Sequence, residues 1–163
     1  MQFKTGKGYS IIELLVVIAI IGVLAALAVG AYTQNMIKSK IAEGIALLNS
    51  YSKQYQEYYA LYNHFPILMA DTVIATPNTQ NVKEIHAGSY SSTGSGMWLY
   101  VVYQDSLGFG VNNRIILAML GDSTTNTTSF YCGQWQTFAY VPTQYLPGGC
   151  NRTSISAIPG LVN

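Results

Sequence analysis

Charged side chains are scarce in this sequence: they make up only 9% of its 163 residues, and the formal net charge is +1. So weak a positive balance creates no basic field that would steer nucleic acid or anionic lipid toward the chain. A net charge this close to zero instead favours self-association. Half of the residues are hydrophobic and thirteen are tyrosine, which is typical of surfaces that are apolar yet wettable, such as subunit interfaces.

The residue types that most often carry catalysis or bind metal ions are also scarce. The two histidines, His64 and His86, lie at an expected helix end and in a serine-rich stretch, and we interpret both as solvated loop residues. No cluster of histidine, cysteine or acidic residues has the spacing of a metal site, and the aspartates do not form a calcium loop. We therefore expect no enzymatic activity, no cofactor and no bound metal.

Proline is absent before Pro66, so no residue of this kind interrupts a helix in the first part of the chain. Within this part, the eighteen residues from Leu14 to Ala31 carry no charged or strongly polar side chain. As a helix they would be about 27 Å long, close to the hydrocarbon thickness of a bilayer. Lys4 and Lys7 precede the run and should stay on the cytoplasmic side, so the rest of the chain is expected beyond the membrane.

A cleaved secretory signal peptide is an alternative interpretation of this segment. A basic start, an apolar core and the small-residue triplet Ala26-Leu27-Ala28 favour it. Two features oppose it, because the run is longer than an ordinary signal-peptide core and Glu13 lies where that core should begin. A carboxylate at the centre of a bilayer is costly, so Glu13 indicates a specific role.

An amphipathic pattern follows the apolar run, with apolar residues at spacings of three and four. Its members are Tyr32, Met36, Ile37, Ile41, Ile45, Leu48, Tyr51, Tyr55, Tyr58 and Tyr62. We predict one helix over 9–62, about 80 Å long, with a transmembrane and assembly part at 9–32 and an amphipathic part at 33–62. The amphipathic part would cover one face of a sheet.

The remaining residues predict that sheet. Residues 63–96 are rich in Thr, Asn, Ser and Gly and read as a connecting loop with one strand near Val82–Ser89. Clearer strand patterns occupy Met97–Tyr103, Arg114–Leu120 and Ser129–Trp135, separated by turn residues that favour an antiparallel meander. We predict an α+β fold with a single core, in which the long helix packs on an antiparallel sheet of about four strands. Residues 97–163 would form the sheet and the closing loop of a globular head.

The residues around the start of the apolar run, Gly8-Tyr9-Ser10-Ile11-Ile12-Glu13-Leu14, resemble the processing site of type IV prepilins. That site has a short basic leader, a glycine, an aromatic residue, and a glutamate at the fifth position of the mature chain. The resemblance implies that a membrane-embedded prepilin peptidase removes the leader 1–8 by cutting between Gly8 and Tyr9. The same enzyme would then methylate the new amine on Tyr9, where relatives usually have Phe.

This resemblance implies assembly roles for Glu13 and for a row of small residues. Glu13 of one subunit would face the Tyr9 amine of a neighbour, so that two groups that are costly alone become paired and select one axial stagger. Before assembly, Glu13 could instead pair with its own N-terminus or reach lipid headgroups. Gly22, Ala26 and Gly30 recur every four residues and would let helices approach closely, although Gly and Ala are simply common in membrane helices. Gly30 stands where common pilins have Pro, so local melting of the helix between Gly22 and Gly30 stays open.

Cys132 and Cys150 are expected to form a disulfide because the compartment beyond the membrane is oxidising, with two free thiols as the alternative. The segments Phe130-Tyr131-Cys132 and Tyr145-Leu146-Pro147-Gly148-Gly149-Cys150 also resemble the disulfide-bounded loop that closes type IVa pilins. The thirteen residues after Cys150 have no assigned role.

Taken together, the resemblance implies a major-pilin-like type IVa subunit, stored in the inner membrane and then polymerised with itself and other pilins into an extracellular filament. An inner-membrane assembly platform would drive this step, and the usual consequences are adhesion, twitching motility or DNA uptake. DNA is an unsupported partner because the loop 133–149 contains no Lys or Arg. Alternatives are a minor or competence pilin and a type II secretion pseudopilin, which tends to bind calcium and to lack the C-terminal disulfide. A membrane-tethered enzyme is more remote.

Overall fold

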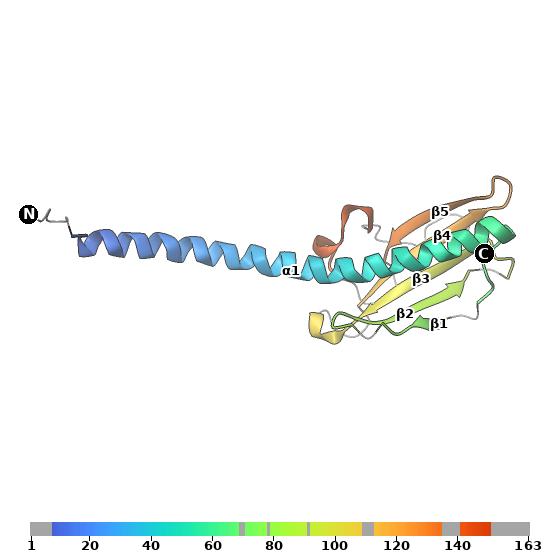
Figure 1. Cartoon of the computed structure of the whole chain (residues 1–163), viewed down its shortest axis with the longest axis horizontal. Coiled ribbons are helices and arrows are strands. Elements are labelled where there is room, and N and C mark those ends of the chain that lie inside the picture. Colours follow the sequence, from blue (N-terminus) through green and yellow to red (C-terminus); the bar gives the residue numbers. More distant parts are fainter. Residues whose placement is uncertain are drawn as a thin grey trace, which may run out of the picture. The chain divides into compact units, whose positions relative to one another are not determined.

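The computed structural model describes residues 8–68, 71–77, 79–90, 92–108, 113–134 and 141–150. One α-helix precedes five β-strands, and three 3-10 turns follow or separate the later strands (Figure 1). The elements are α1 (Ile11–Tyr62), β1 (Thr72–Ala75), β2 (Val82–Ser89), β3 (Gly96–Tyr103), η1 (Asp105–Leu107), β4 (Arg114–Asp122), β5 (Thr127–Gly133), η2 (Thr143–Tyr145) and η3 (Gly148–Cys150). The chain forms two compact units, Met1–Met36 and Ile37–Asn163.

The first unit contains the apolar part of α1, and every residue from Gly8 to Met36 is exposed. The most apolar eighteen-residue window of α1 has a mean hydropathy of 3.0, and none of it is buried within the chain. By length and composition this helix can cross a membrane. The predicted span 9–62 agrees with α1 to within two residues at its start and ends at the same residue, Tyr62.

The second unit is built on a five-stranded antiparallel sheet in the order β1-β2-β3-β4-β5, so each strand pairs with its neighbours in sequence. The side chains of each strand alternate between two faces. In β3, Leu99, Val101 and Tyr103 belong to the main core, whereas Trp98 and Tyr100 belong to a second cluster. This alternation divides the sheet into an inner face and an outer face.

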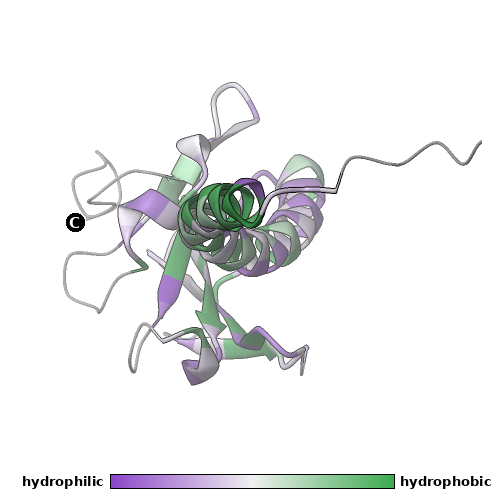
Figure 2. Ribbon diagram, turned by 90° about the vertical axis from the view of Figure 1, so that its left-hand side faces the viewer, coloured by the Kyte–Doolittle hydropathy of each residue, from purple (hydrophilic) through white to green (hydrophobic). Residues whose placement is uncertain are grey.

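The inner face packs against the second half of α1. Ile41, Leu48 and Tyr59 of the helix are fully buried in one cluster with inner-face residues of the strands. The apolar colouring of these strands is visible in Figure 2. The Tyr103 hydroxyl donates a hydrogen bond to the Ile41 carbonyl oxygen at 2.7 Å, across the helix-sheet contact. Gly44 makes room for this ring, because a Cβ there would lie 2.5 Å from the Tyr103 hydroxyl oxygen. The predicted amphipathic helix on a sheet is therefore confirmed.

The region 63–96, predicted as a connecting loop with one strand, contains two strands. β2 matches the predicted strand Val82–Ser89, and β1 was not predicted. β1 has only four residues, lies at the edge of the sheet, and its register with β2 shifts between Val73 and Ala75. A strand of four residues is too short to show an alternation of apolar and polar residues in the sequence, so β1 could not be predicted. The sheet therefore has five strands rather than the predicted four or so. β5 begins two residues earlier than the predicted strand Ser129–Trp135 and ends at Gly133.

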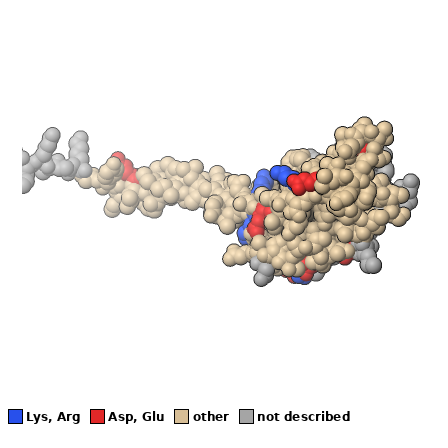
Figure 3. All heavy atoms as spheres, turned by 45° about the vertical axis from the view of Figure 1, so that its right-hand side comes forward, with Lys and Arg blue, Asp and Glu red and all other residues tan. Residues whose placement is uncertain are grey.

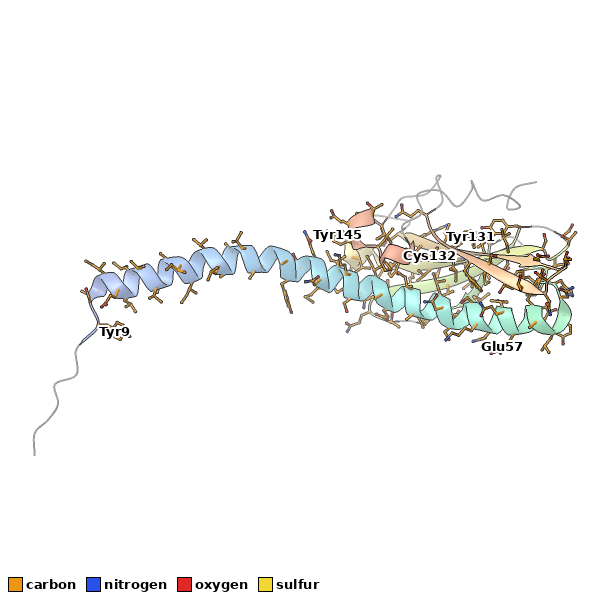
Figure 4. The ribbon with its side chains drawn as sticks, turned by 90° about the horizontal axis from the view of Figure 1, so that it is seen from above. Tyr9, Glu57, Tyr131, Cys132 and Tyr145 are labelled. Carbon is orange, nitrogen blue, oxygen red and sulfur yellow. A yellow bond between two sulfur atoms is a disulfide. The ribbon has the colours of Figure 1, made fainter. Side chains whose placement is uncertain are left out.

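The disulfide expected between Cys132 and Cys150 is present. Cys132 lies in β5 and Cys150 in η3, with their Cα atoms 4.4 Å apart. Tyr131, Cys132 and Tyr145 are labelled in Figure 4, which shows this region from above. The bond joins the end of the edge strand to the last described turn, and free thiols are excluded.

Replacing Cys132 by Ser should lower the free energy of unfolding of the second unit by about 3 kcal/mol, because the lost bond closes a loop with a sequence separation of 18. We expect a lower urea midpoint and less subunit in the cell envelope. Cys150→Ser is the matched control and should give the same shift. An unchanged midpoint in both variants would show that the bond does not contribute to stability.

Replacing Gly121 by Ala should destabilise the second unit by about 1–3 kcal/mol, because an added methyl overpacks the core. Its Cβ would lie 2.1 Å from the Tyr59 ring, and Tyr59 cannot move freely since it packs against Phe65. The matched control is Gly148→Ala, whose Cβ would meet no atom within 4 Å. Thermal melts of both variants test this, and equal melting temperatures would contradict it.

Candidate functional site

The start of α1 holds the sequence-predicted processing and assembly residues. Ser10 precedes the first helical residue, and its carbonyl oxygen accepts the hydrogen bond of the Leu14 N–H at 3.2 Å. The Glu13 carboxylate accepts a hydrogen bond from the Ser10 backbone N–H at 2.9 Å. This is the glutamate half of a capping box, in which the third helical residue reaches back to the residue before the helix. It fixes the beginning of α1 at Ile11.

A carboxylate in the first helical turn is also electrostatically favoured, because the exposed N–H groups at a helix start carry partial positive charge. The sequence predicted a role for Glu13 but not this hydrogen bond. The pattern Ser10-x-x-Glu13 could have indicated it, since Ser followed three residues later by Glu before an apolar run is a helix-start signature. Within its own chain, the partner of Glu13 is therefore the backbone of Ser10.

The Gly8–Tyr9 peptide bond lies outside the helix. Neither residue has regular secondary structure, and Tyr9 is 89% exposed. Figure 4 shows Tyr9 ahead of the first turn of α1. An exposed peptide bond outside a helix can enter the active site of a peptidase, whereas a helical one would first have to unwind. Hydrolysis of this bond would leave a free amine on Tyr9, one residue before the cap.

The small residues of α1 face open space within this chain. A Cβ added at Gly22 or Gly30 would meet no atom within 4 Å. The Gly30 carbonyl oxygen accepts a hydrogen bond from the Thr33 hydroxyl at 2.9 Å in addition to its place in the helix. α1 is continuous through Gly30 in the isolated chain. Close approach of a second helix along Gly22, Ala26 and Gly30 stays a prediction.

Charge is almost absent from the described residues of the first compact unit, Met1–Met36. Of its described residues, 8–36, Glu13 is the only one with a charged side chain. In Figure 3 the described part of this region is tan apart from one acidic spot, and the remaining charged atoms gather on the second unit. A single carboxylate in a long apolar surface can make the one charged contact between two such helices. The position of its partner would therefore set the axial alignment of the helices.

The interpretation of His86 as a solvated loop residue is wrong. His86 lies in β2 and is only 8% exposed, with its ring stacked on Tyr100 at 4.5 Å between centroids. Its Nδ1 is 2.8 Å from an Asp71 carboxylate oxygen, and its Nε2 is 3.1 Å from a Glu84 carboxylate oxygen. Cross-strand pairing with Tyr100 buries the ring, and this pairing cannot be read from the neighbouring serines. His64, in contrast, is exposed as expected.

Hydrogen bonds among Asp71, His86 and Tyr100 link the start of the edge strand β1 to β2 and β3. Asp71, directly before β1, accepts hydrogen bonds from the Tyr100 hydroxyl and from His86. Burial by itself would raise the pKa of Asp71, but these two hydrogen bonds outweigh it and hold that pKa below its usual value. Both nitrogens of His86 are already occupied by carboxylates. Among the described residues no group of three histidines, cysteines or acids is arranged to hold a metal ion.

Two grooves border the second half of α1. One, of about 320 Å³, is lined by Asn49, Ser52, Lys53, Gln56, Leu117 and Phe130. The other, of about 310 Å³, is lined by Lys38, Ala42, Tyr145, Leu146 and Pro147. Neither lining includes a histidine, a cysteine or a carboxylate.

Comparison with known proteins places these features in a family. The profile of the prokaryotic N-terminal methylation motif matches residues 4–29, which include Gly8, Tyr9 and Glu13. The chain is similar to fimbrial protein EcpC of Eikenella corrodens, with 32% identity over 155 residues that cover 94% of this chain and 96% of that protein.

Two further relatives extend the comparison. The type IV major pilin protein PilE1 of Neisseria gonorrhoeae is 30% identical over 135 residues, covering 78% of this chain and 76% of PilE1. The type IV major fimbrial protein FimA of Dichelobacter nodosus is 51% identical over 41 residues, which cover 25% of this chain and 26% of FimA. The methylation motif, the exposed apolar helix, the antiparallel sheet and the closing disulfide thus occur together, and the chain belongs to the type IV pilin family.

Proposed function

We propose that this pilus structural subunit assembles through the first half of α1 into an extracellular filament in which it is the major pilin. The observation that carries the proposal is the apolar surface of α1 from Ile11 to Met36, which no described part of its own chain covers. Such a surface needs an apolar environment, first a bilayer and then neighbouring copies of the same helix. PilE1 is named a type IV major pilin protein and FimA a type IV major fimbrial protein, which supports the proposal that this chain is a major subunit.

Processing is the first step of this proposal. A prepilin peptidase would cut the exposed Gly8–Tyr9 bond at the cytoplasmic face of the inner membrane and methylate the Tyr9 amine. The absence of helix at Gly8 and Tyr9, before the Ser10 cap, supports cleavage at this position. An inner-membrane assembly platform would then transfer the subunit from the bilayer to the filament.

Pairing between Glu13 and the Tyr9 amine of a neighbouring copy would set the axial register of the filament. The capping hydrogen bond uses Oε2 of Glu13. An ionised carboxylate has about four acceptor positions on its two oxygens, so it can accept from an amine while it still caps the helix. Long apolar helices tolerate many staggers, and one buried ion pair would select among them.

The filament would support adhesion, twitching motility or DNA uptake, and a structural rather than an enzymatic role is proposed for the chain itself. A minor or competence pilin that binds DNA is less well supported, because residues 133–149 contain no Lys or Arg. A type II secretion pseudopilin is less well supported because the Cys132–Cys150 disulfide is present.

Replacing Glu13 by Ala should permit leader cleavage yet reduce filament yield. Removing one partner of a buried ion pair costs about 3–5 kcal/mol, which corresponds to a roughly hundredfold or greater loss in the association constant. Quantifying pilin in sheared filaments against pilin in membranes measures the effect.

Glu13→Gln is the matched variant, because its amide oxygen can still cap Ser10 but carries no charge. We expect Glu13→Gln to assemble as poorly as Glu13→Ala. If Glu13→Gln instead gave wild-type filament yield, the capping hydrogen bond rather than the charge would be the essential feature, and the register role would be rejected.

The abundance of the chain in a sheared-filament fraction, together with its intact mass, tests the proposed function directly. We expect a dominant species that starts at a methylated Tyr9 and is two hydrogens lighter for the disulfide. Gly8→Ala is the control and should leave an uncut precursor in the membrane and none in filaments. If only a trace of the chain were found outside the cell envelope, the major-pilin proposal would be rejected in favour of a minor pilin or a pseudopilin.

A further inference from the structure

The imidazole ring of His86 lies between two carboxylates on the outer face of the sheet. Its Nδ1 is 2.8 Å from an Asp71 oxygen, and its Nε2 is 3.1 Å from a Glu84 oxygen. Asp71 directly precedes β1, whereas Glu84 and His86 both belong to β2. The Asp71 contact therefore joins the start of the edge strand to its neighbour, and the Glu84 contact stays within one strand.

The number of protons on the ring decides how many of these contacts are hydrogen bonds. A neutral imidazole has one N–H donor and one acceptor nitrogen, whereas the charged imidazolium has two donors. An ionised carboxylate only accepts hydrogen bonds. Only the charged form of His86 can thus bond Asp71 and Glu84 together. In the neutral form the two carboxylates compete for one ring proton, and the loser faces a nitrogen lone pair.

Tyr100 of β3 cannot relieve this competition. Its ring is stacked on His86, and its hydroxyl donates a hydrogen bond to Asp71. Burial of Tyr100, together with this hydrogen bond, raises the pKa of its hydroxyl, so the hydroxyl keeps its proton and remains a donor. Tyr100 is also central to the apolar outer cluster around Ile116 and Ala118. The Asp71 contacts therefore tie the edge strand to the middle of this cluster.

Two cations complete the charged surroundings of the ring. The Arg114 guanidinium of β4 lies 4.7 Å above the Tyr100 ring, and the Lys83 Nζ is 3.9 Å from a Glu84 oxygen. Both cations and the burial of the ring oppose a positive charge on His86, whereas Asp71 and Glu84 favour it. Favourable and unfavourable influences thus surround a side chain whose type gains and loses its proton near neutral pH.

The edge strand depends on these contacts more than any other strand would. β1 has four residues, and its register with β2 contains three residue pairs, against seven between β2 and β3. This register also shifts between Val73 and Ala75. With so short a ladder, side-chain hydrogen bonds at its start contribute a large share of what holds β1 in place.

We propose that Asp71, His86 and Glu84 form a proton-operated latch, which holds β1 firmly while His86 is charged and loosens when the ring loses its proton. Hydrogen bonds between two charged groups are stronger than those with a neutral donor. The latch is therefore complete at low pH and weakens as the pH rises through the range in which histidine titrates, about pH 5 to 8.

Asp71 sets the lower limit of this range. Burial alone would raise the pKa of Asp71, but the hydrogen bonds from Tyr100 and His86 hold it below its usual value. Its carboxylate therefore stays ionised while His86 changes its charge. A loosened β1 would uncover the backbone N–H and C=O groups of β2, and an unpaired strand edge can pair with another chain.

Nuclear magnetic resonance of the mature full-length chain in mild detergent tests the latch. Nitrogen shifts of the His86 ring report its protonation, and hydrogen exchange of the Thr72–Ala75 amides reports the pairing of β1. Exchange is expressed relative to the β4 amides, which cancels the general acceleration with pH. From about pH 5.5 to about pH 8 we expect the ring to lose one proton. Relative exchange in β1 should then rise about fivefold, as a charge-assisted bond becomes an ordinary one.

Glu84→Gln separates the latch from a general effect of pH. The glutamine amide can donate to an unprotonated Nε2, so that a neutral His86 keeps its Nδ1 proton for Asp71. We expect this variant to lose most of the pH dependence of β1 exchange, and His86→Gln, which cannot titrate, to lose all of it. His64→Gln changes the other histidine, which is exposed, and should behave as the unmodified chain.

Three results would overturn the proposal. The ring could keep the same protonation at both pH values, it could titrate with no change in β1 exchange, or Glu84→Gln could retain the full pH dependence. If His86→Gln unfolds the sheet, shown by lost protection of the β4 amides, the comparison of Glu84→Gln with the unmodified chain decides. That variant keeps the imidazole ring and its contact with Asp71.

Discussion

The apolar surface on the first half of α1 is the constraint on which the rest of the protein depends. No residue from Gly8 to Met36 is buried within the chain. A bilayer and a bundle of identical helices both satisfy this surface. Exchange of one apolar environment for the other therefore provides little hydrophobic driving force, as for helix association within lipid. Selective assembly must come from features that distinguish a neighbouring helix from lipid, and this part of α1 has two, its row of small residues and Glu13.

Glu13 can serve both environments because its carboxylate has more than one function. Its hydrogen bond to the Ser10 N–H compensates part of the cost of a charge at the edge of an apolar helix. The same bond marks the start of the helix after Tyr9, so the Gly8–Tyr9 peptide bond, the proposed cleavage site, lies outside it. A neighbour's amine would add to this interaction rather than replace it. The proposed processing and the proposed register pairing would thus rely on one local conformation.

Much of the fold could be predicted from the sequence, and the failures have physical causes. The periodicity from Tyr32 to Tyr62 predicted the second half of α1. The apolar runs Met97–Tyr103 and Arg114–Leu120 predicted β3 and β4 closely, because most residues of these strands are buried on both faces. The edge strand β1 and the burial of His86 were missed. Both depend on contacts between residues far apart in sequence, since Asp71 bonds to His86 fifteen residues later and to Tyr100 twenty-nine residues later. The site residues Gly8, Tyr9 and Glu13 were identifiable because their motif is local.

The two apolar faces of the sheet also give the disulfide a second consequence. Cys132 packs against the inner core, while its neighbour Tyr131 belongs to the outer cluster. The bond to Cys150 therefore fixes a chain segment at the edge where the two faces meet. The far edge is closed differently, by the hydrogen bonds of Asp71 and His86, and Arg114 lies 4.7 Å above the Tyr100 ring. Polar groups thus border the outer face on the β1 side, and a covalent anchor borders it on the β5 side.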